Sequence, residues 1–346
     1  LPPQVAFPFN KGWQETAPLF MKLGPPVKLF AVHSGPESTR HSADVWPSDY
    51  DLAETYLPHF KRTVEEGGAY SVMCAYQRLN GAPCCGSKFL ENILRNNWNF
   101  QGYIVSDCGA IQDFYDKKAH NIVATQASAM AVKAGTDLNC GSVYARSLLN
   151  AVKQGLVTEA EINISVKRLI MARMKLGQFD PNDKVKYAQI PLSVVDCQQH
   201  KEVALESAHK SMVLLKNADN TLPFSKDVKR VAVIGPNADN REILLGNYNG
   251  FPSNGITPLK GIVAKLPNAV VNYAQGCRLA DELPCLTAIS SKYFFTDKSL
   301  KKNGLNGEYF TGKKFIGKLK HKRIDEKLDF VWWSKAPFND MQPDSF

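Results

Sequence analysis

Short apolar runs that alternate with amphipathic helical patterns are the feature that most constrains the fold of this chain. The runs typical of buried strands lie at 27–33, 69–76 and 102–110, and a shorter strand and turn is expected at 135–141. The helical patterns lie at 49–66, 87–98, 120–134, 143–154 and 158–177. This alternation predicts a parallel sheet covered by helices, and about four strand–helix units would form half of an eightfold barrel.

The remainder of the chain differs in character from this region. Residues 1–27 are rich in proline and show no sustained period, and residues 179–191 have the Pro, Asp and Lys content of a linker. A long helical pattern at 193–211 precedes a second α/β unit at 229–239. From about residue 287 the chain is rich in Lys, Gly and aromatic residues, with strand-like segments at 304–310 and 328–333.

Composition and charge exclude several classes of protein. Hydrophobic residues make up 44% of the chain and charged residues 22%, which is typical of a globular protein. No run approaches the roughly 18 apolar residues that span a bilayer, so we expect no membrane partner. Much of the net charge of +9 lies in residues 292–329, with eleven Lys or Arg against five Asp or Glu. Because Lys alternates with apolar residues there and no nucleic-acid-binding motif accompanies it, we expect a solvated strand face and no nucleic-acid partner.

The cysteines and histidines show no spacing typical of a metal site. There is no C-x2-C pair among the eight cysteines, and His33, His41 and Asp44 lack the spacing of helical ligands. We therefore expect no metal. Cys277 and Cys285 could close a short loop, but the sequence does not fix a disulfide pattern.

Asp107 is the strongest candidate for a catalytic side chain. It follows an apolar strand and lies among the small residues Ser106, Cys108 and Gly109, at the carboxyl end of a strand, where such folds carry their chemistry. A carboxylate there can attack an electrophilic carbon, accept a proton or bind a metal. The alternative is an Asp that caps the next helix, and position alone leaves both open.

Several segments together resemble glycoside hydrolase family 3, in its β-xylosidase/β-glucosidase branch. GYIVSDCGAIQDFY resembles the family's nucleophile signature, with Asp107 at the nucleophile position. KLFAVHSGPESTRH resembles its Lys-His-Phe segment, and AYSVMCAYQRLNGAPCC and AGTDLNCG resemble two further strand regions. SMVLLKN and RVAVIGPNAD resemble the start of the family's second domain, whereas NGLNGEYF and DFVWW resemble the opening of a PA14-type insert.

The resemblance implies an α/β fold made of three incomplete parts. These are the C-terminal half of a (β/α)8 TIM-like barrel, the first part of an α/β sandwich domain and the beginning of an all-β PA14-like insert. The expected division is an atypical N-terminal segment 1–27, a partial barrel 28–180, a linker 181–205, a partial sandwich 206–290 and a truncated PA14-like module 291–346.

The resemblance also implies an exo-acting retaining β-glycosidase, either a β-D-xylosidase or a β-D-glucosidase. Such an enzyme hydrolyses terminal non-reducing β-linked sugars through a covalent intermediate, here on Asp107, without a metal or organic cofactor. The partner is an oligosaccharide or β-glycoside, the oligomeric state is open, and export to the periplasm or the cell exterior is implied although this chain holds no signal peptide. The residues that match sugar-contacting positions, or lie in the same loop region, are Lys28, Met73, Tyr76, Arg40 and His41.

Two departures from the family limit this expectation. Leu29 stands where the family has His after its Lys, so we expect a missing sugar contact or an altered local register. The family's acid/base Glu matches no residue of this chain, and no motif supports Glu37, Glu65 or Glu242. We therefore expect the isolated chain to be weak or inactive, because an unassisted leaving group costs about 10²–10⁴-fold in rate. A non-catalytic carbohydrate-binding protein and a basic nucleic-acid-binding protein remain as alternatives.

Overall fold

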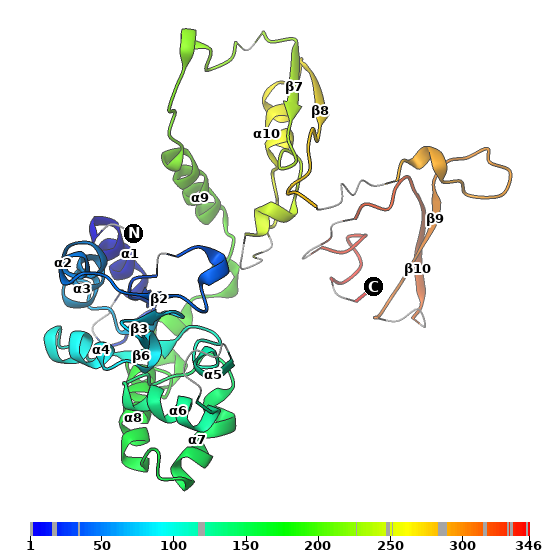
Figure 1. Ribbon diagram of the computed structural model, residues 1–346. Helices are drawn as coiled ribbons and strands as arrows, with labels where there is room; N and C mark the ends of the chain where they lie inside the picture. The colour runs from blue at the N-terminus through cyan, green and yellow to red at the C-terminus, as the bar shows by residue number, and fades with distance from the viewer. Residues whose placement is uncertain are drawn as a thin grey trace. The chain divides into compact units, whose positions relative to one another are not determined.

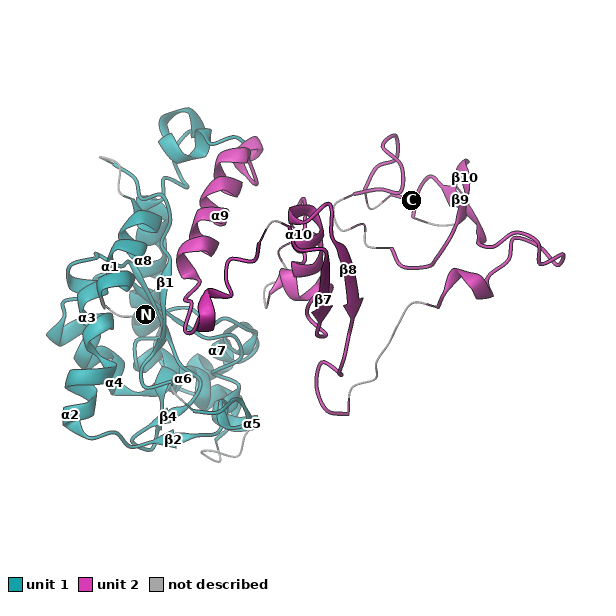
Figure 2. Ribbon diagram, turned by 90° about the horizontal axis from the view of Figure 1, so that it is seen from above, with its two compact units in different colours: residues 1–191 teal, residues 192–346 magenta. Residues whose placement is uncertain are grey.

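The chain forms two compact units, Leu1–Pro191 and Leu192–Phe346, which are described separately (Figure 2). The boundary lies inside the predicted linker 181–205. The computed structural model describes all residues except 1–2, 16–18, 34, 117–121, 226, 247–249, 251, 283–288, 314–316, 331, 333–334 and 344.

A parallel sheet forms the centre of the first unit (Figure 1). Its strands β1 (Pro26–Phe30), β3 (Ser71–Cys74) and β6 (Tyr103–Ser106) lie in the order β1-β3-β6, which confirms the three predicted apolar strands. The strand predicted at 135–141 is reduced to one parallel bridge between Val105 and Leu138. It is this short because the chain turns at both ends, where Gly135 and Gly141 have φ angles of 87° and 140°.

Helices follow the strands and cover the sheet. They are α1 (Pro3–Gln14), α2 (Asp49–Asp51), the π-helical η2 (Leu52–Tyr56), α3 (Pro58–Glu65), α4 (Lys88–Leu90), the π-helical η4 (Glu91–Asn97), α5 (Asp113–Asp116), α6 (Ala124–Lys133), α7 (Val143–Lys153) and α8 (Glu159–Lys175). The last two confirm the predicted helices at 143–154 and 158–177. The helix predicted at 49–66 is interrupted at Leu57, because Pro58 has no N–H with which to continue the helical hydrogen bonds.

Helix α1 lies in the segment 1–27, where the sequence shows no sustained apolar period. The helix is anchored by polar side chains: Asn10 Nδ2 donates to Gly67 O at 3.2 Å and Gln14 Nε2 donates to Gly68 O at 2.7 Å. These carbonyls belong to the turn that ends α3, against which α1 packs. Because the buried contacts are polar, an apolar 3.6-residue period cannot reveal this helix.

The core of the first unit is built around Phe30 at the end of β1. Phe30 is fully buried and meets Phe60 of α3 edge-to-face, with ring centroids 5.0 Å apart. The indole of Trp98, which follows η4, meets it in the same way at 5.8 Å. Edge-to-face pairs of this kind add about 0.5–1.5 kcal/mol each beyond the area they bury. The aromatic cluster therefore holds β1 against the two helices that follow β1 and β3.

The connections that follow β1 and β3 form a small second sheet. Strand β2 (Asp44–Val45) pairs in parallel with β4 (Arg78–Leu79), which pairs with β5 (Ala82–Pro83). The 3-10 turns η1 (Glu37–Thr39) and η3 (Cys84–Gly86) flank this sheet in sequence. The pairing brings the two connections side by side close to the carboxyl ends of the main strands.

A parallel βαβ unit and a hairpin form the regular structure of the second unit. Strand β7 (Arg230–Ile234), helix α10 (Pro258–Lys265) and β8 (Val270–Ala274) confirm the second α/β unit, and α9 (Gln198–Ser211) confirms most of the predicted helix 193–211. Over the described residues, no helix of the chain is both long and apolar enough to cross a bilayer. Short 3-10 turns lie in both units. Those of the first unit are η5 (Asn182–Lys184) and η6 (Lys186–Gln189), and those of the second are η7 (Leu192–Val194), η8 (Ala218–Asn220), η9 (Glu242–Leu245) and η10 (Ser291–Tyr293).

The hairpin joins β9 (Leu305–Phe310) and β10 (Leu319–Asp325) in antiparallel pairing. Burial alternates along β10, with Lys320 and Lys322 exposed, which confirms the predicted solvated lysine face. The opposite face is polar rather than apolar, because it carries His321, Arg323 and the buried Asp325. The strand predicted at 328–333 is wrong for the residues described there, since 328–330 and 332 have no strand structure. The rings of Phe330 and Trp332 stack with their centroids 4.9 Å apart.

Candidate active site

Asp107 lies directly after β6, at the edge where the carboxyl ends of the parallel strands meet. Its N–H donates to Cys74 O at 3.2 Å, which extends the pairing of β6 with β3 by one residue. The residue is 6% exposed, and its carbonyl accepts from Ala110 N at 3.0 Å as the chain turns. The helix-capping alternative is wrong, because the next helix begins only at Asp113.

Cys108 connects the Asp107 carboxylate to Tyr76. The Cys108 N–H donates to Asp107 Oδ1 at 2.7 Å, and the Tyr76 hydroxyl donates to Cys108 O at 3.1 Å. Burial of the phenol, together with the negative charge of Asp107, raises the pKa of Tyr76 to about 12. Tyr76 therefore remains a protonated hydrogen-bond donor beside the carboxylate at neutral pH.

Two disulfides, whose pairing is not predictable from the sequence, connect the strand ends around Asp107 and Tyr76. Cys108–Cys140 joins the turn after β6 to the turn that follows Leu138. Cys74–Cys85 joins the last residue of β3 to η3 and so encloses the segment that carries Tyr76. The neighbouring segments at the carboxyl edge are thus joined covalently.

Arg40 and His41 lie against the same tyrosine. The ring of His41 meets that of Tyr76 edge-to-face at 4.4 Å, and the Arg40 guanidinium lies 5.9 Å from its centroid. His41 Nδ1 is 2.6 Å from Asp113 Oδ2, and Arg40 is paired with Glu37 at 2.6 Å. The loop after β1 is therefore attached to the helix that follows Asp107, with Tyr76 between them.

Met73 lies on β3, next to the strand that leads to Asp107, and Lys28 lies on β1, one strand further away. Met73 pairs with Val105 of β6, and Lys28 lies in β1 at a break in the register between Val27 and Phe30. Two residues of β1 face one residue of β3 there, and Leu29 has a φ of 67°. The irregularity of β1 thus lies at Leu29, whereas a missing sugar contact or a register altered from that of the family stays a prediction.

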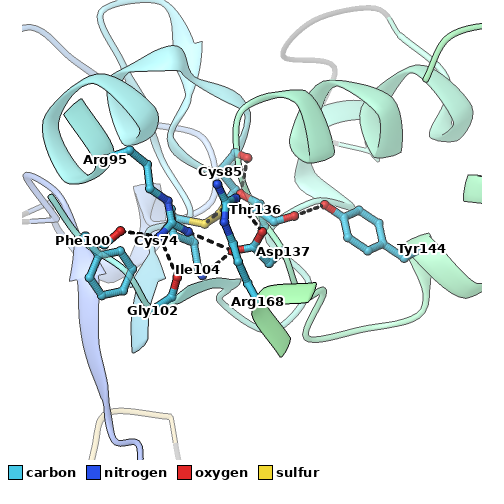
Figure 3. A network of polar contacts seen from close by, with 10 residues as sticks. All are labelled: Cys74, Cys85, Arg95, Phe100, Gly102, Ile104, Thr136, Asp137, Tyr144 and Arg168. Atoms are coloured by element: carbon cyan, nitrogen blue, oxygen red, sulfur yellow. Dashed lines mark hydrogen bonds and ion pairs between the residues drawn. A yellow bond between two sulfur atoms is a disulfide. The ribbon is translucent and has the colours of Figure 1, made fainter. Parts of the chain in front are cut away.

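The first half of β6 and the turn before it are held by a buried carboxylate between two arginines (Figure 3). Asp137 Oδ2 accepts from Ile104 N of β6 at 2.9 Å and from Arg95 at 3.1 Å, and Asp137 Oδ1 accepts from Arg168 at 2.9 Å. Arg95 also donates to two carbonyls in the turn before β6, and the Tyr144 hydroxyl donates to Thr136 O. The network joins β6 to η4, α7 and α8.

His33, which follows β1, contacts a glutamine side chain. His33 Nδ1 lies 3.0 Å from Gln77 Oε1, and Gln77 Nε2 donates to Ala31 O at 2.7 Å. Across the part of the chain that is described, no group of three or more His, Cys, Asp or Glu side chains could hold a metal ion. The grouping of His33, His41 and Asp44 considered from the sequence is therefore not such a group.

The sequence indicated Asp107, Tyr76, Arg40 and His41 as site residues. The structure places these four close together. It did not identify Asp113 or the two disulfides. The one available signal was that Cys108 and Cys140 each lie close to the carboxyl end of a predicted strand, where parallel neighbours converge. Cys285, considered as a partner of Cys277, lies outside the described residues.

Two family models match the chain in order. The model of the glycosyl hydrolase family 3 N-terminal domain matches residues 4–172, and the model of the C-terminal domain of that family matches residues 212–332. The first match includes helix α1, and the second continues past residue 291, where the sequence suggested that a different module begins.

Curated relatives are similar over most of this chain. A xylan 1,4-beta-xylosidase of Xylanibacter ruminicola is 41% identical over 302 residues, which are 86% of this chain and 34% of the relative. The probable beta-D-xylosidase 7 of Arabidopsis thaliana is 42% identical over 72% of this chain and 32% of its own length. The chain thus spans about a third of the relatives it matches.

Solved structures show the same similarity. The GH3 exo-beta-xylosidase XlnD, in complex with a xylobiose aziridine activity-based probe, superposes with a TM-score of 0.75 at 33% identity, over 81% of this chain and 37% of that structure. The β-glucosidase EmGH1 of Erythrobacter marinus gives a TM-score of 0.70 at 27% identity, over 80% and 37%.

Proposed function

Because the chain belongs to glycoside hydrolase family 3, we propose that it carries the nucleophile and the adjoining part of the sugar site of an exo-acting retaining β-glycosidase. The observation that carries this proposal is the position of Asp107. Its nearly buried carboxylate lies at the carboxyl end of a parallel strand, accepts an N–H from Cys108 and lies beside the hydroxyl of Tyr76.

The chemistry assigned to Asp107 is attack on the anomeric carbon. The carboxylate forms a bond to C1 while the glycosidic oxygen leaves with the bonding electrons, and water later cleaves the resulting ester with net retention of configuration. The N–H that Cys108 donates to Oδ1 stabilises the negative charge and fixes one oxygen, so that the other can attack. Because the one O–H of Tyr76 donates to Cys108 O, the phenol oxygen is left to accept a hydrogen bond from a sugar hydroxyl.

Four further residues are proposed to line the sugar site with Tyr76. Arg40 and His41 contact Tyr76 from the loop after β1, and Met73 lies on β3 next to the strand that leads to Asp107. Lys28 lies on β1 across from Met73 and is proposed to hydrogen-bond sugar hydroxyls. Since His41 is already paired with Asp113, we propose that His41 orients the ring of Tyr76 toward the sugar.

The proposed substrate is a terminal β-linked xyloside, with a β-glucoside as the second candidate. The two curated relatives described above are named as β-xylosidases, and the solved structures include both a β-xylosidase and a β-glucosidase. We assign no proton donor within this chain, because no residue matches the family's acid/base Glu.

The proposed architecture follows the family. The first unit corresponds to the C-terminal half of a (β/α)8 barrel, with α1 now included in that domain, and the βαβ unit corresponds to the start of the α/β sandwich. The hairpin of β9 and β10 is proposed as the opening of a PA14-like module at 291–346. Two disulfides in the first unit support export to the periplasm or the cell exterior, where such bonds persist.

A series of aryl β-xylosides with leaving groups of decreasing pKa tests this function on the chain as it stands. We expect release of dinitrophenol, which departs without protonation, and little reaction with a methoxyphenyl xyloside. Azide should accelerate turnover and yield β-xylosyl azide, because it attacks C1 of the covalent intermediate and displaces Asp107.

The controls separate this function from its alternatives. Asp107→Asn should abolish dinitrophenol release, whereas Asp180→Asn, which changes an exposed carboxylate in the same unit, should not alter it. A chain that binds xylo-oligosaccharides but releases no dinitrophenol would be a non-catalytic binder. Rates that are high and independent of the leaving group would reveal a proton donor in this chain and contradict that part of the proposal.

A further inference from the structure

We infer that the Cys108–Cys140 disulfide is a positioning element for the nucleophile, and that it is the one of the two disulfides through which a reductant would switch the site off. The inference rests on the function proposed for Asp107. It concerns how the carboxylate is held, rather than which residue attacks the sugar.

Cys108 is the residue through which both partners of the site are oriented. Its N–H donates to Asp107 Oδ1 at 2.7 Å and its carbonyl accepts from the Tyr76 hydroxyl at 3.1 Å. A displacement of this one residue would therefore change the direction of the carboxylate and release the phenol together. The covalent restraint on such a displacement is the disulfide through Cys108 Sγ, which acts beside the hydrogen bond from Gly109 N to Cys140 O.

The other half of the disulfide is fixed to the same strand. Cys140 N donates to Ser106 Oγ at 3.0 Å, and Cys140 O accepts from Gly109 N at 2.8 Å. Ser106 N donates to Leu138 O at 2.9 Å, which fixes the start of this turn. The bond thus closes a small ring of contacts around Asp107, and its loss leaves Cys108 on an exposed turn before Gly109, whose φ is 84°.

The two disulfides differ in their access to a reductant. Cys108 is exposed and Cys140 partly exposed, whereas Cys74 and Cys85 are fully buried. The free thiol next to the buried pair, Cys84, is itself buried, and burial raises its pKa to about 12. Because the thiolate is the attacking form in disulfide exchange, Cys84 does not attack the neighbouring Cys74–Cys85 disulfide.

Reduction by dithiothreitol is a balanced two-electron exchange. A thiolate of the reagent attacks one sulfur of Cys108–Cys140 and releases the other cysteine as a thiolate, and the second thiol of the reagent then closes its ring. The products are two protein thiols and the cyclic disulfide of the reagent. Oxidised glutathione or air reverses the change.

The test uses the full chain in its oxidised and mildly reduced forms. Alkylation and peptide mapping should show label on Cys108 and Cys140 and none on Cys74 or Cys85. Each form is then treated with dinitrophenyl 2-deoxy-2-fluoro-β-xyloside, whose leaving group needs no proton donor, and the labelling rate is followed by mass spectrometry over a range of probe concentrations.

We expect reduction to lower the maximal labelling rate by about 10- to 100-fold, the cost of misplacing a reacting group by about 1 Å. The half-saturating concentration should change less than threefold, because sugar contacts outside Cys108 remain. Reoxidation should restore the rate, and Cys140→Ser should match the reduced form. Cys197→Ser, which removes a free thiol in the other unit, is the matched control and should label as the wild type does.

A second measurement is independent of any reaction with sugar. In a chain with 13Cζ-labelled tyrosine, the signal assigned to Tyr76 by Tyr76→Phe should shift on reduction, because the bond to Cys108 O is lost, while that of the buried Tyr309 in the other unit stays in place.

An unchanged Tyr76 signal together with an unchanged labelling rate would overturn the inference. General loosening would also overturn it, and would appear as shifts of many tyrosine signals and a raised half-saturating concentration. If the oxidised chain takes no label at all, the proposed function fails, and the Tyr76 signal alone then decides whether the disulfide positions Cys108.

Discussion

Replacement of Asp137 by asparagine tests whether the hydrogen bonds and ion pairs of Asp137 stabilise β6, the strand that leads to Asp107. The Asp137 side chain is 0% exposed, against 11% for Arg95 and 26% for Arg168, so both arginines lose a largely dehydrated counter-charge. Asn keeps one acceptor oxygen in place of two. It can satisfy Ile104 N or one arginine, but its amide N–H groups face the other.

The size of the effect follows from two opposed contributions. Removal of one partner from a buried ion pair costs about 3–5 kcal/mol of unfolding free energy. Burial raises the pKa of Asp137 even though Arg168 and Arg95 oppose the shift, so dehydration of the carboxylate already offsets part of its attraction to them. We therefore expect a loss of about 3 kcal/mol, the lower end of that range.

Hydrogen exchange of the peptide that contains β6, measured over a series of urea concentrations, reports the loss of unfolding free energy for the first unit alone. Asp180→Asn, at an exposed position, should stay within about 0.5 kcal/mol of the wild type. Arg168→Gln should cost only about 1–2 kcal/mol, since Arg168 is partly exposed and Arg95 still neutralises Asp137. The reasoning is refuted if Asp137→Asn lies within 0.5 kcal/mol of the wild type, or if Arg168→Gln costs more.

Three further predictions concern the same unit. Gly102→Ala should lower the unfolding free energy in urea by about 3 kcal/mol, because a Cβ there would lie 2.1 Å from Tyr70 O, and an unchanged midpoint would contradict this. Thr158→Ala should remove about 1 kcal/mol by the same assay, since it opens the capping box of α8, and no loss would show that the cap is dispensable. Tyr76 binds its proton more tightly when folded, so the wild type should lose more stability than Tyr76→Phe between pH 10 and 12, and parallel pH curves would count against the raised pKa.

The parallel sheet was predictable because its strands are apolar runs bounded by turn residues, a strong local signal. Asp107 was predictable for a related reason, since a polar residue that ends such a strand lies where the neighbouring strands also end. Helix α1 was not, because its buried contacts are the amides of Asn10 and Gln14 rather than an apolar stripe.

Other features depend on contacts between segments far apart in the sequence. The pairing of Cys108 with Cys140 follows from the bridge between Val105 and Leu138, which brings two turns together across 32 residues. The partnership of His41 with Asp113 spans 72 residues and has no local pattern at all. The sequence therefore indicates which residues end at the site, whereas the contacts that orient them come from tertiary structure.

The central claim is that Asp107 forms the covalent bond to the sugar, and peptide mapping of a trapped adduct tests it most directly. The chain is incubated with dinitrophenyl 2-deoxy-2-fluoro-β-xyloside and digested at low pH, and the labelled peptide is sequenced by mass spectrometry. We predict one fluoroxylosyl ester per chain, on Asp107, and none in Asp107→Asn. A label on any other carboxylate, or equal labelling of the variant, would contradict the assignment.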